Sequence, residues 1–163
     1  LLVPLEILGN PLLGSALAIL GDITDVVWLD LLGTANIAEY YNQFDKGFDL
    51  YMYLLMGYTT LSWKNLLARK TALGLLGVRL IGTIIYEIFP HRFLLLVFPN
   101  VFIWVFLFHL ITTQIFNRDY FKSWKHAVVI TTLLAIPKIY QEYLFHVAQI
   151  PLYQWAQAIL PFI

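Results

Sequence analysis

The sequence contains no cysteine and few charged residues for its length. The lack of cysteine excludes disulfides, thiol catalysis, and zinc or iron–sulfur sites built on cysteine ligands. Only 12% of the 163 residues are charged and 60% are hydrophobic, whereas soluble domains have about 25% charged residues. So few charges cannot cover the surface of a chain this size, and we therefore expect lipid to be the solvent for much of it.

Several other features are also missing. The ten basic residues are balanced by ten acidic ones, so the basic excess typical of nucleic-acid-binding proteins is absent and no nucleic-acid partner is expected. The sequence has no phosphate-binding loop, no GxSxG and no HExxH motif, which removes the common signatures of nucleotide hydrolysis, serine hydrolysis and zinc proteolysis. It therefore assigns no catalytic residue and no cofactor.

Long apolar runs predict an all-α fold, a polytopic transmembrane helical bundle in one domain over 1–163. A spanning helix needs about 20 mostly apolar residues. The first run contains three aspartates, so it is either one span or a short re-entrant piece followed by an interfacial helix. The last segment, 150–163, contains Trp155 between two prolines and predicts an amphipathic helix in the headgroup region. About five spans are expected, at 12–32, 47–67, 71–89, 93–116 and 124–147.

The charges of the connecting loops predict how the chain crosses the membrane. The connections at 64–70 and 118–126 are basic, whereas the loops between them in the serpentine path are acidic or short. Because cytoplasmic loops carry an excess of Lys and Arg, both basic loops are expected in the cytoplasm. The sequence thus predicts an integral membrane protein, whose expected partners are the lipid bilayer and either other membrane subunits or further copies of itself.

Arg79 is the most anomalous residue, because it lies near the middle of an apolar run. A charge at that depth costs about 3 kcal/mol on insertion scales and usually faces a partner or water. The candidate partners are Asp49 or Glu142 on other helices, or Glu87 about two turns further along the same helix. This pattern indicates either an ion pair that fixes helix packing or a binding site for a ligand or ion.

A polar stripe on the last expected span raises the same question. Lys138, Glu142 and His146 are spaced by four residues and therefore share one helix face. Glu142 and His146 can coordinate one metal ion if His109 or Asp49 supplies further ligands. A simple Lys–Glu pair beside a helix-end histidine explains the same spacing, and we favour it, so no metal is expected.

Pro99 and Asn100 interrupt the most apolar run. A proline removes a backbone donor and bends a helix, and an asparagine side chain can satisfy the freed backbone groups. We therefore expect a kink here that either shapes a cavity or only bends the helix.

Three strings carry a resemblance: FDKGFDLYMY at 44–53, LLLVFPNVF at 94–102 and KIYQEYLFHVAQ at 138–149. They resemble an uncharacterised family of bacterial, actinobacterial-type integral membrane proteins, over about residues 40–149. The resemblance implies that the membrane is a bacterial plasma membrane. The family pattern has an acidic residue where this chain has Ile103, and the resemblance implies no activity. The matching positions are Asp45, Lys46, Asp49, Arg79, Pro99, Asn100, Gln141, Glu142, Tyr143 and His146.

Three functions fit these features. The first is a non-catalytic subunit or scaffold of a membrane complex, which the small number of polar residues favours and which predicts no open cavity beside Arg79 and Glu142. The second is a small oligomeric transporter or ion-conducting protein, with a water-accessible path along Asp49, Arg79, Glu142 and His109. The third is a membrane-embedded enzyme acting on a lipid-like substrate, in a lateral cleft containing Glu142 and His146.

Overall fold

The computed structural model describes residues 3–20, 38–89, 91, 93–144 and 148, and every regular element in these ranges is a helix. The predicted all-α class is therefore confirmed. The expected interfacial helix at 150–163, His146 and the three aspartates of the first run lie outside the described residues.

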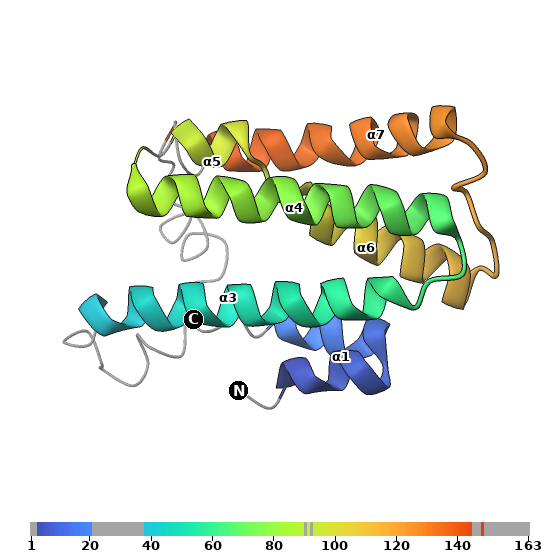
Figure 1. Ribbon diagram of the computed structural model, residues 1–163, viewed down its shortest axis with the longest axis horizontal. Helices are drawn as coiled ribbons and strands as arrows, with labels where there is room; N and C mark the ends of the chain where they lie inside the picture. Colours follow the sequence, from blue (N-terminus) through green and yellow to red (C-terminus); the bar gives the residue numbers. More distant parts are fainter. Residues whose placement is uncertain (1–2, 21–37, 90, 92, 145–147, 149–163) are drawn as a thin grey trace, which may run out of the picture.

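The N-terminal part is a set of short helices packed on one long helix. The 3-10 turn Val3–Leu5, α1 (Glu6–Gly9) and the helix Pro11–Leu20 precede α3, which runs from Ala38 to Leu61. The turn and α1 both contact α3, and Figure 1 shows them along one side of it. The long helix α3 begins earlier than the span expected at 47–67 and ends at Leu61, before that range ends.

Helix α4 (Leu66–Ile88) is the one helix in the described part of the chain that is long and apolar enough to cross a membrane. It begins where Asn65 caps it, because the Asn65 side chain accepts hydrogen bonds from the amides of Leu67 and Ala68. Only 17% of its most apolar 18-residue stretch is buried. A core helix of a soluble protein would be mostly buried, so α4 leaves its apolar surface available to lipid or to another protein.

The most apolar run is broken, not merely bent. Instead of one helix over 93–116, the chain forms α5 (Phe93–Val97), a break, α6 (Val101–Leu110) and a π-helical turn at Ile111–Ile115. Pro99 explains the break, because it has no N–H and disfavours helical backbone at the preceding residue. The side chain of Asn100 makes no capping hydrogen bond to α6, which leaves it available for contacts with other helices.

Helix α6 forms the centre of the bundle. It packs against α4 and against α7 (Trp124–Glu142), while α4 also packs against α3. In Figure 1, α4 and α7 run in the same direction, and α3 and α6 run in the opposite one. Helices α6 and α3 supply five fully buried side chains of the core: Phe102, Val105, Phe106, Met52 and Met56. Ile7 of α1 and Ala68 and Ala72 of α4 are also fully buried.

The two basic connections lie at the same end of the bundle. Asn65, between α3 and α4, donates its amide N–H to Asp119 Oδ2 at 2.6 Å and to the Phe121 carbonyl at 2.9 Å. Asp119 and Phe121 lie between α6 and α7, more than fifty residues away in sequence. Asn65 therefore ties the two loops together while it caps α4.

Candidate functional site

Four polar residues far apart in sequence lie at one level of the bundle. Asp49 lies within α3 and Arg79 within α4. Asn100 directly precedes the first residue of α6, and Glu142 is the last residue of α7. At a rise of about 1.5 Å per residue, each lies about 18–27 Å from the end that carries the basic loops. Helices α3 and α6 run toward the end with the basic loops, and α4 and α7 run away from it. The four residues therefore lie at a similar distance from that end.

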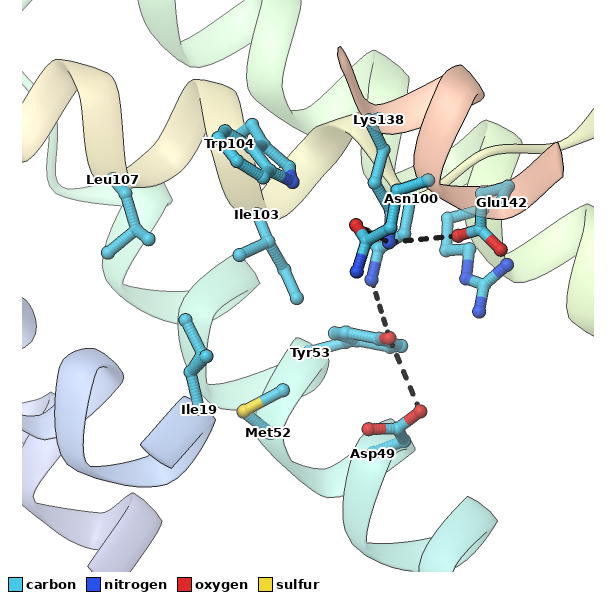
Figure 2. A pocket seen from close by; sticks show the side chains of 12 residues that line it. Ile19, Asp49, Met52, Tyr53, Asn100, Ile103, Trp104, Leu107, Lys138 and Glu142 are labelled. Atoms are coloured by element: carbon cyan, nitrogen blue, oxygen red, sulfur yellow. Dashed lines mark hydrogen bonds and ion pairs between the residues drawn. The ribbon is translucent and has the colours of Figure 1, made fainter. Parts of the chain in front are cut away.

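They surround a cavity of about 420 Å³. Figure 2 shows that the cavity has an apolar side and a polar side, with Ile103, Trp104 and Leu107 on the first and Asn100, Lys138 and Glu142 on the second. The complete lining is Asp49, Tyr53, Arg79, Asn100, Lys138, Gln141 and Glu142, together with Ile19, Met52, Ile103, Trp104 and Leu107.

A chain of hydrogen bonds crosses one wall of the cavity. The Asn100 amide N–H donates to the Tyr53 hydroxyl at 2.7 Å, and this hydroxyl donates to Asp49 Oδ2 at 3.4 Å (Figure 2). Asn100 is only 6% exposed and Tyr53 only 4%. The side-chain oxygen of Asn100 is buried and has no hydrogen-bond partner among the residues that the structure describes. The chain links α3 to the break before α6 and leaves one strong acceptor unused.

Lys138 and Glu142 form an ion pair along α7, as their spacing predicted. Lys138 Nζ lies 2.9 Å from Glu142 Oε1, and the two side chains are 15% and 7% exposed. The same ammonium donates to Gln141 Oε1 at 3.2 Å. The charge of Lys138 is therefore balanced within its own helix.

Arg79 does not form the ion pair expected with Asp49, Glu87 or Glu142 anywhere in the ranges that the structure covers. Its guanidinium donates from Nη1 to the Phe98 carbonyl at 3.2 Å. Its Nε is buried and has no hydrogen-bond partner within the described part of the chain. The break at Pro99 accounts for the difference, because it leaves Phe98 outside a helix and its carbonyl available as an acceptor beside Arg79.

Three other predicted residues are not part of this cluster. His109 is buried in the last turn of α6. The centroid of its ring lies 4.1 Å from that of the Trp63 ring and 5.7 Å from that of the Phe121 ring. Glu87 is exposed near the end of α4 and does not line the cavity. His146 falls outside the described residues, and those described contain no group of three His, Cys, Asp or Glu that could bind a metal ion.

Sequence reasoning did not single out Tyr53 or Trp104 as lining residues. Tyr53 follows Asp49 by four residues, so helix periodicity places both on one face of α3. That spacing was a usable signal, because a tyrosine next to a carboxylate on a helix face can extend its hydrogen bonding. Trp104 carries no such signal, because it resembles the other large apolar residues around it.

Comparison with known proteins finds no match among protein-family models, curated proteins or solved structures.

Proposed function

We propose that this protein crosses a bacterial plasma membrane about five times and binds a small polar solute between its helices in order to transport it. The observation that carries the proposal is the cavity, in which Asp49, Arg79, Lys138 and Glu142 meet inside a bundle with an apolar exterior. Ionisable residues at such depth are costly in a bilayer and usually mark a pathway or binding site.

The outer surface of the bundle supports the membrane part of the proposal. Helix α4 exposes large apolar side chains at positions three and four apart, and α7 does the same on its outer face. Contiguous exposed apolar surface of this kind indicates contact with a membrane or with another protein. The exposed residues are Val78, Ile81, Ile84 and Ile88 on α4, and Val128, Val129, Leu133 and Ile136 on α7.

The orientation follows from the loop charges. Since Asn65 joins the two basic connections, both lie on one side of the membrane, and the positive-inside rule assigns that side to the cytoplasm. The cavity, about 18–27 Å from the basic end, then lies in the outer half of a hydrocarbon core about 30 Å thick. A solute would reach it first from outside the cell.

The scaffold hypothesis predicted no open cavity beside Arg79 and Glu142, so the cavity favours transport. A scaffold role remains a second candidate on one observation, the apolar outer face of α7, which would suit another membrane subunit. Nothing in the described residues favours the enzyme hypothesis, whose cleft required His146.

The orientation can be tested directly because the chain has no cysteine. We expect a membrane-impermeant maleimide to label Lys122→Cys only from the cytoplasmic side and His91→Cys only from the outer side. Lys122 and His91 are both exposed, the first beside the Asn65–Asp119 contact and the second between α4 and α5. Labelling of both cysteines from the same side of intact cells and inverted vesicles would contradict the proposed topology.

Transport can be tested in proteoliposomes with a panel of labelled amino acids, carboxylates, amines and sugars. We expect flux of at least one solute above that of protein-free liposomes, and loss of this flux in both Arg79→Ala and Glu142→Ala. The matched control is Glu87→Ala, because Glu87 is exposed and does not line the cavity. No flux of any solute, or flux that survives both cavity substitutions, would exclude transport through this cavity.

A further inference from the structure

We infer that the end of the bundle with the two basic connections binds the headgroups of anionic phospholipids, such as phosphatidylglycerol. Residues 61–70 and 115–126 form this end and are called the basic face. The inference goes beyond transport, but it rests on the proposed membrane orientation, because it requires the basic face to lie at a lipid surface. Three features carry it: an excess of positive charge, the lack of counter-charges within the described chain, and exposed aromatic rings in the same connections.

The basic face concentrates the positive charge of the chain. It contains six of the ten basic residues and only one of the ten acidic residues. The contacts of Asn65 with Asp119 and with the Phe121 carbonyl hold the two connections together, so charges from distant parts of the sequence share one end of the bundle (Figure 1). Five of the six basic side chains are exposed and one is partly buried. The six are Lys64, Arg69, Lys70, Arg118, Lys122 and Lys125.

The one carboxylate of the basic face already accepts hydrogen bonds from neutral donors. Asp119 Oδ2 accepts from the Asn65 side chain at 2.6 Å, and Oδ1 accepts from the Phe121 amide at 2.9 Å. None of the six basic side chains forms an ion pair with any residue that the structure describes. Arg69 donates instead to a neutral group, the Leu61 carbonyl, at 3.1 Å. Most of the positive charge of this face is therefore left for an anionic partner.

Helix stability does not explain the charge either. Arg69 lies in the first turn of α4 and Lys125 in the first turn of α7, and neither helix has an acidic residue in that turn. The first turn of a helix carries a partial positive charge, which favours acidic side chains and disfavours basic ones. Basic side chains gathered at one end also repel one another. A bound anionic partner would offset both penalties.

Exposed aromatic and aliphatic side chains in the same two connections indicate that the partner is lipid. Phe116, Tyr120 and Trp124 are all exposed. Tyrosine and tryptophan concentrate at the depth of the headgroups, where their rings contact acyl chains and their polar atoms contact water. An acidic soluble protein would match the charge, but it would leave the exposed Leu61 and Ile115 without an apolar environment. A membrane interface accommodates both, because apolar side chains enter the bilayer while the basic groups meet phosphates.

The test uses the full chain reconstituted in phosphatidylcholine vesicles and measures the quenching of its tryptophan fluorescence by brominated lipids. Bromine quenches on contact, so phosphatidylglycerol and phosphatidylcholine brominated near the top of their acyl chains report which lipid lies beside a ring. The difference between the unmodified chain and Trp124→Phe gives the quenching of Trp124, which is exposed on the basic face.

We expect Trp124 to report a binding constant for phosphatidylglycerol at least about tenfold above that for phosphatidylcholine, since each basic residue at an anionic surface contributes about fivefold. The preference should fall toward equality when the NaCl concentration is raised from about 0.05 M to about 0.5 M, because salt screens exposed charges. This comparison of salt concentrations needs no charge-changing variant.

A double substitution locates the contact. Lys122→Gln combined with Lys125→Gln removes two exposed charges next to Trp124 in sequence, and we expect it to lower the preference for phosphatidylglycerol by about fivefold or more. The matched control is Lys122→Arg combined with Lys125→Arg, which keeps both charges and should keep the preference. Thermal unfolding checks that both variants are folded.

Equal binding constants for the two lipids would overturn the inference and leave transport standing. A preference that survives both the loss of the two lysines and the high salt concentration would also overturn it. Displacement of phosphatidylglycerol by millimolar glycerol phosphate would overturn it as well, by assigning the face to a soluble phosphate ester. A preference for phosphatidylglycerol without flux of any solute would support the inference and exclude transport. No quenching of Trp124 by either lipid would overturn the inference together with the proposed membrane orientation.

Discussion

Replacing Glu142 by leucine is expected to destabilise the bundle by about 3–5 kcal/mol, the usual cost of removing one partner from a buried ion pair. Lys138 would keep its ammonium in a place where the side chain is only 15% exposed. Its remaining hydrogen bond, to the Gln141 side chain, is to a neutral group and cannot replace the carboxylate. Reversible unfolding in mixed detergent micelles measures the change in the free energy of unfolding.

A double substitution separates the loss of the pair from the loss of packing. Lys138→Met combined with Glu142→Leu removes both charges, so we expect it to be more stable than Glu142→Leu alone, by about 2 kcal/mol or more. Glu87→Leu is the control for placing leucine on an exposed carboxylate position, and its effect should stay within about 0.5 kcal/mol. A Glu142→Leu variant as stable as the control would show that the ion pair is not buried in solution.

The second large effect is expected at Gly82, where a single methyl group should disturb the cavity from a distance. Gly82 is buried on α4, and a Cβ atom there would overlap Cβ and Cγ of Phe98. These atoms are near the backbone and cannot swing aside as the end of a flexible side chain could. Gly82→Ala should therefore displace Phe98, whose carbonyl accepts from Arg79, and cost about 1–3 kcal/mol by overpacking.

Gly77 provides the matched control on the same helix. A Cβ atom at Gly77 meets nothing within 4 Å, so Gly77→Ala should stabilise α4 by about 0.5–1 kcal/mol, as alanine does relative to glycine inside a helix. The same unfolding experiment compares the two variants. If both alanines shift stability in the same direction, the close contact between Gly82 and Phe98 is not present in solution.

The free-energy cost of placing a charged side chain in a bilayer was the argument that located the site from the sequence. Arg79, Glu142 and Asp49 were singled out because charge is expensive in apolar runs, and the structure places all three around one cavity. The spacing of Lys138 and Glu142 also predicted their ion pair, because a four-residue interval is a local property of a helix.

Contacts between helices could not be read in the same way. The acceptor for Arg79 is a backbone carbonyl, and every residue has one, so no residue type marks it. The contact between Asn65 and Asp119 joins residues 54 positions apart, and asparagine and aspartate are common in any polar loop. His109 was expected near Asp49 and Glu142 because it is an ionisable residue in an apolar run. It does not line the cavity and packs instead against aromatic rings.

The contact between Arg79 and Phe98 has a consequence for the order of events during synthesis. The chain leaves the ribosome from its N-terminus, so in the proposed membrane topology Arg79 would insert well before Lys138 and Glu142 are synthesised. Its acceptor at Phe98 follows only 19 residues later, within the next hydrophobic segment to emerge. An arginine at the centre of an inserting helix costs about 2.5–3.5 kcal/mol, and this early contact would reduce that cost while the nascent chain still lacks its last helix.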